Sequence, residues 1–71
     1  MKFEWFDGFK IEVILSNNAV LIKANVEGIK PLVNCLTALS ESKAHGAHIH
    51  LDEFNSLEPG SIEVVFEKVD E

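Results

Sequence analysis

The chain has 71 residues, of which 46% are apolar and 25% charged, so it is long enough for one small folded domain and too hydrophobic for a disordered segment. Its formal net charge is −6 and it contains no arginine. Nucleic acids and anionic membrane surfaces are therefore poor partners, because binding either of them requires clustered cations.

The sequence has no feature of a membrane or secreted protein. Its longest apolar runs span about four residues, against the roughly 18 that a membrane helix needs. The N-terminus lacks the apolar core of a signal peptide. We therefore expect a single cytoplasmic domain over residues 1–71. The single cysteine, Cys35, excludes an internal disulfide and the usual thiolate-rich zinc sites.

The first third of the chain has the pattern of a strand meander. A short aromatic run, Phe3–Phe6, is followed by Asp7-Gly8, a strong signal for a two-residue hairpin turn. Phe9–Leu15 then alternates apolar and polar residues, as a half-buried strand does. Asn17-Asn18 predicts a second turn. Ala19–Ala24 follows with four apolar residues in a row, which suits a central strand covered on both faces.

The period then changes to that of a helix, which we expect over about residues 28–42. Asn25 is a candidate N-cap, but Pro31 would then lie well inside the helix, so a start near Gly28 costs less. Cys35 falls at the flank of the apolar stripe and is expected to be packed rather than reactive. The stripe itself has three-and-four spacing and consists of Ile29, Leu32, Val33, Leu36 and Leu39.

Two more strands are predicted after the helix. Gly46 suits the chain's exit from the helix, and Ala47–Asp52 reads as a strand. A loop ending in Pro59-Gly60 leads to a last strand, about Ser61–Val69. The order βββαββ predicts an α+β fold, an antiparallel sheet of about five strands with one helix packed on one face.

The histidines are concentrated just before the acidic end of the chain. On a strand, His48, His50 and Asp52 point the same way, and a paired last strand would bring Glu63 or Glu67 to that face. Two imidazoles and a carboxylate can bind a divalent metal such as zinc, with His48 and His50 as the leading ligands. The same groups can instead form a ladder of cross-strand ion pairs or contact a partner.

The net charge lies entirely in the last twenty residues. Residues 1–51 contain five acids and five lysines, whereas residues 52–71 contain seven acids and one lysine. An acidic surface of this kind prefers a basic partner. We do not expect an enzyme, because the serines and glycines lie in no catalytic or phosphate-binding motif and the chain leaves little room for a substrate pocket.

One block of the sequence resembles a known family. Residues 46–53 and 56–64 are similar to the G-x-H-x-H-L-D…L-x-x-G-S block of Immunity protein 32, a family of bacterial polymorphic-toxin systems. The resemblance implies a protein that binds a cognate toxin domain and neutralises it. The block maps onto Gly46, His48, His50, Leu51, Asp52, Gly60 and Ser61.

We therefore expect a non-catalytic binding protein whose acidic hairpin, residues 48–67, contacts a basic toxin domain. One alternative is a small metal-binding module centred on His48 and His50. Another is a homodimer or larger homo-oligomer, since apolar residues on both faces of the first strand weakly favour a sheet completed by a neighbour. The expected partner-contacting residues are His48, His50, Asp52, Glu53, Glu58, Glu63 and Glu67.

Overall fold

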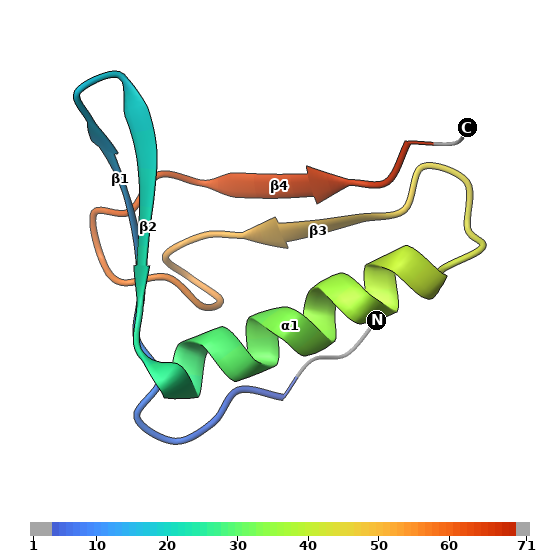
Figure 1. Ribbon diagram of the computed structural model, residues 1–71, viewed down its shortest axis with the longest axis horizontal. Coiled ribbons are helices and arrows are strands. Elements are labelled where there is room, and N and C mark those ends of the chain that lie inside the picture. Colours follow the sequence, from blue (N-terminus) through green and yellow to red (C-terminus); the bar gives the residue numbers. More distant parts are fainter. Residues whose placement is uncertain (1–3, 70–71) are drawn as a thin grey trace.

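A computed structural model describes residues 4–69 and has the element order ββαββ (Figure 1). The α+β class is confirmed, but the predicted five-stranded sheet is wrong. The strands of the described residues form two separate antiparallel pairs, β1 with β2 and β3 with β4. The bounds are β1 Ile11–Ser16, β2 Ala19–Ala24, α1 Val26–Glu41, β3 His48–Leu51 and β4 Val64–Glu67.

The first hairpin turns at the two asparagines, as the sequence predicts. Asn17 and Asn18 have φ of 50° and 64°, the left-handed pair that a tight hairpin turn requires. The strand before the turn buries Ile11 and Val13. The prediction that 19–24 is a central strand was wrong, because among residues 4–69 β2 pairs only with β1, and residues 19–23 are exposed on both faces.

No strand precedes the first hairpin in the described residues. Residues 4–6 are not in a strand, and Phe3 lies outside the described range. Asp7-Gly8 does form a turn, closed by a hydrogen bond from Phe9 N–H to Phe6 O (3.1 Å). The rings of Trp5 and Phe9 stack at 5.0 Å between centroids and pack against the core.

The edge of β1 where a third strand could pair is covered by the segment 58–62. Pro59 and Gly60 interrupt this segment, so it does not form a regular ladder and β4 begins at Val64 instead of the predicted Ser61. Its three bonds to β1 run from Glu58 N–H to Ile11 O (2.8 Å), from Ile62 N–H to Val13 O (2.8 Å) and from Val13 N–H to Ser61 Oγ (3.2 Å).

The helix begins earlier than predicted because Asn25 is its N-cap. Asn25 Oδ1 accepts hydrogen bonds from Gly28 N–H (3.0 Å) and Lys10 N–H (2.9 Å), and Asn25 Nδ2 donates to Gly8 O (2.9 Å). One side chain therefore caps α1 and ties it to the chain before β1. Pro31 lies inside the helix, where it removes one ladder bond, but its ring is fully buried.

The helix face that meets the core differs from the predicted stripe. Gly28, Pro31, Cys35 and Leu39 are buried, and Leu32 is partly buried. The predicted core residues Ile29, Val33 and Leu36 are 48%, 56% and 41% exposed. Cys35 lies at the centre of the buried face, so its packing is confirmed, and burial raises the pKa of its thiol.

The second hairpin runs alongside α1 and completes the core (Figure 1). Ile49 and Leu51 of β3 are buried with Leu57, and Val64 and Phe66 of β4 pack against them. Lys68 Nζ donates to the helix C-terminal carbonyls Ser40 O (3.0 Å) and Ser42 O (2.7 Å). The β1–β2 hairpin rises beside this layer and projects away from α1 (Figure 1).

Within residues 4–69, no helix has the length and hydropathy needed to cross a bilayer.

Replacing Asn25 tests its role as the link between α1 and the segment before β1. We expect Asn25→Ala to lower the free energy of unfolding by about 2 kcal/mol, because it removes the cap and two further hydrogen bonds. Urea denaturation measures this change, with Asn34→Ala at an exposed position of α1 as the control. Equal stability of the two variants would contradict the assigned role.

Gly28 marks the closest approach of the helix to β1. A Cβ at this position would lie 2.8 Å from Lys10 O and 2.9 Å from Ile11 Cγ1. Because Lys10 O is a backbone atom, the backbone itself would have to shift to relieve this overlap. We expect Gly28→Ala to destabilise the fold by about 1–2 kcal/mol, although alanine is the better helix former by about 1 kcal/mol. A thermal melt in which the variant matches or exceeds the wild type would show that the contact is not tight.

Candidate functional site

The outer face of the β3–β4 hairpin presents polar groups in the order that strand alternation predicts. His48 and His50 are exposed, whereas Ile49 and Leu51 point into the core. The strands pair antiparallel with His48 opposite Glu67. The structure therefore confirms that the two histidines share a face with carboxylates of the last strand region. What these groups bind stays a prediction.

His50 is the centre of a three-residue cluster. Its Nε2 lies 3.5 Å from Asp52 Oδ2 and 3.0 Å from Glu63 Oε1. One ligand atom from each of the three residues lies within 4.8 Å of the other two. The cluster joins the end of β3, the residue after it and the segment before β4. His48 does not belong to it, and its Nδ1 instead lies 3.2 Å from Gly46 O.

The turn that follows β3 holds Asp52 in place. Asp52 Oδ1 accepts hydrogen bonds from Phe54 N–H (2.9 Å) and Asn55 N–H (3.1 Å). Asn55 in turn donates from Nδ2 to His50 O (2.9 Å) and accepts from Asp52 N–H through Oδ1 (3.1 Å). Because Oδ1 caps the turn, Oδ2 is left facing His50. The local sequence Asp52–Asn55 thus orients one carboxylate oxygen toward the imidazole.

The seven predicted contact residues do not form one continuous row. His48, His50, Glu63 and Glu67 lie on the β3–β4 outer face, and Asp52 adjoins them. The other two acids lie in the connecting loop: Glu53 Oε2 accepts a hydrogen bond from Gly60 N–H (2.9 Å), and Glu58 lines a cleft beside β1.

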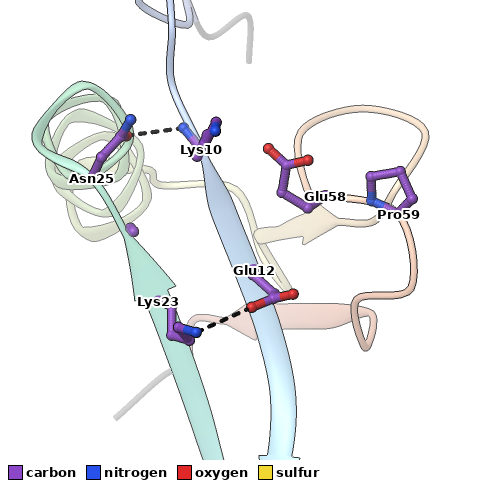
Figure 2. A pocket seen from close by; sticks show the side chains of 7 residues that line it. Lys10, Glu12, Lys23, Asn25, Glu58 and Pro59 are labelled. Atoms are coloured by element: carbon purple, nitrogen blue, oxygen red, sulfur yellow. Dashed lines mark hydrogen bonds and ion pairs between the residues drawn. The ribbon is translucent and has the colours of Figure 1, made fainter.

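This cleft lies between the first hairpin and the loop before β4 (Figure 2). Its charged groups balance, two lysines against two glutamates, and Lys23 Nζ lies 3.7 Å from Glu12 Oε1. Sequence reasoning did not identify the cleft, because its lining comes from segments far apart along the chain, with no shared motif. The lining residues are Lys10, Glu12, Lys23, Ala24, Asn25, Glu58 and Pro59.

A second feature missed from the sequence is an exposed apolar surface. On β2, Val20, Leu21 and Ile22 are 63%, 42% and 45% exposed. The run of apolar residues that predicted a covered strand is therefore open to solvent. Extended apolar surfaces of this kind are more typical of interaction sites than of monomer surfaces.

Comparison with known proteins identifies the chain's family. A family model described as Immunity protein 32 matches residues 19–69, which run from the start of β2 beyond the end of β4. Neither the curated proteins nor the solved structures gave a significant match. Because the family model covers well over half of the 71 residues, the chain belongs to the Immunity protein 32 family.

Proposed function

From its membership of the Immunity protein 32 family, we propose that this protein neutralises a cognate toxin domain by binding it and has no catalytic activity of its own. The family match is the observation that carries the proposal. An immunity family indicates a toxin-neutralising binding role in general terms. The nature of the toxin surface is inferred from the charges of this chain.

The acidic hairpin, residues 48–67, is the proposed contact surface, and its target is a basic region of the toxin. The last twenty residues hold seven of the chain's twelve acids and one lysine. Glu63 and Glu67 are exposed on the same face as the two histidines. Opposite charges across an interface raise the rate of association and exclude partners of the wrong sign. The histidines add directional hydrogen-bonding groups at the centre of that face.

Charge reversal on this face tests the proposal. The immobilised chain is used to capture proteins from a lysate of its source organism, and the column is washed at low and then high salt. We expect a basic protein that is retained at low salt and released at high salt. The double variant Glu63→Lys, Glu67→Lys should retain at least about tenfold less of it, because both charges then repel a basic surface.

The matched control reverses two charges elsewhere. Glu4→Lys with Glu41→Lys changes the net charge by the same amount at exposed positions outside the hairpin. It should capture the basic protein as the wild type does. If both double variants capture equally less of the basic protein, the loss is due to the change in net charge and not to the hairpin, which would contradict the proposal. Undiminished capture by Glu63→Lys, Glu67→Lys would refute the acidic hairpin as the contact surface.

The exposed edge of β2 supports a second proposal, the pairing of two copies of the chain. β1 is bonded on its other side by the segment 58–62, so β2 is the edge of this sheet within the described residues. Its single charge, Lys23, is paired with Glu12. Two β2 strands related by a two-fold axis can pair antiparallel and form a four-stranded sheet, with Val20 opposite Ile22 of the second copy.

Sedimentation tests this pairing independently of any toxin. We expect the wild-type chain to shift from the 7.9 kDa monomer to twice that mass as its concentration rises. Val20→Lys with Ile22→Lys should keep it monomeric, because charged side chains would face one another across the pair. Val33→Lys, at a helix position 56% exposed, is the control and should behave as the wild type. A wild type that stays at 7.9 kDa would refute the dimer.

A further inference from the structure

We propose that His50, Asp52 and Glu63 form a binding site for one divalent transition-metal ion, with zinc as the metal best suited to it. The inference rests on the geometry of these three side chains and not on the proposed toxin-binding function. It replaces the sequence-based expectation that His48 and His50 lead the site, since the structure gathers His50 with the two carboxylates.

The distances within the cluster fit a small metal ion. Zinc binds histidine nitrogen and carboxylate oxygen at about 2.0–2.2 Å, so ligands at the corners of a tetrahedron lie roughly 3.3–3.5 Å apart. The distances from His50 Nε2 to Asp52 Oδ2 and to Glu63 Oε1 are 3.5 and 3.0 Å. Side-chain movements of a few tenths of an ångström therefore complete the geometry along these two edges.

The ligand types select among metals. An imidazole nitrogen favours zinc and other transition metals over magnesium and calcium, which prefer sets of oxygen ligands. With a neutral imidazole, the two carboxylates balance the charge of a divalent cation. His50 and Glu63 have side chains that are 45% and 62% exposed, so a fourth position is open to water or to a side chain of a partner.

The site is partly organised before a metal binds. The turn after β3 holds Asp52 through two backbone N–H donors to Oδ1, and its side chain is only 24% exposed. Oδ2 is therefore presented to His50 at little cost in side-chain entropy. Hydrogen bonds of this kind to a ligand's second oxygen are typical of protein metal sites.

His48 supplies a matched control. It lies on the same strand and the same face, two residues before His50, but outside the cluster. Isothermal titration with zinc chloride should show one ion bound per chain for the wild type and for His48→Ala. His50→Ala and Glu63→Gln should weaken zinc binding at least about tenfold. Zinc should raise the melting temperature of the wild type and His48→Ala, with little effect from magnesium or calcium.

Each result decides for or against the site. Zinc binding that survives in His50→Ala, or that is lost equally in His48→Ala, would assign the ion to other ligands and overturn the proposal. A wild type that takes up no zinc at neutral pH would leave the cluster as a set of ion pairs. Circular dichroism of the metal-free variants shows whether each one still folds. A variant that folds but no longer binds zinc has lost a ligand. The zinc titrations use the isolated chain, so their results do not depend on whether a toxin is captured.

Discussion

The fold depends on the close contact between the start of α1 and the chain that enters β1. Asn25 caps the helix and at the same time bonds the backbone at Gly8 and Lys10. Gly28 then allows the first turn of α1 to lie against Lys10 O and Ile11. This contact sets the position of β1 relative to the helix, and the segment 58–62 in turn binds β1 and so places the start of β4. The position of Glu63 in the His50 cluster thus depends, through β1 and the segment 58–62, on the contact at the start of α1.

Small residues in the first half of the buried helix face allow α1 to lie close to β1. The face toward the core contains Gly28, Pro31 and Cys35, which permit a close approach of backbone to strand. Ile29 and Val33, on the neighbouring side of the helix, are about half exposed. A stripe of apolar residues at helical spacing predicts that a helix forms, but it does not say which side turns inward when small residues lie on the neighbouring side.

Local signals in the sequence predicted the elements, whereas long-range pairing was beyond them. The Asn17-Asn18 turn, the bounds of β2 and the alternation in β3 were predicted correctly, because each depends on residues close together in the chain. The five-stranded sheet failed because the edge of β1 is bonded by a Pro-Gly segment about fifty residues away, which sequence periodicity cannot reveal. For the same reason, the sequence predicted that β2 would be a central strand.

The side-chain directions in the candidate site could be predicted for residues on a strand, but not for residues in a turn or loop. Alternation along β3 places His48 and His50 on one face, and antiparallel pairing brings acids of the last strand region to it. His50, and not His48, belongs to the cluster because it lies beside Asp52. The carboxylate of Asp52 is oriented by a turn that has no repeating sequence pattern. Glu53 and Glu58 lie in the connecting loop that the sequence predicts, but the sequence does not reveal that Glu53 bonds Gly60 N–H or that Glu58 lines the cleft beside β1. Charge composition identifies an acidic segment, but backbone hydrogen bonds decide which of its carboxylates act together.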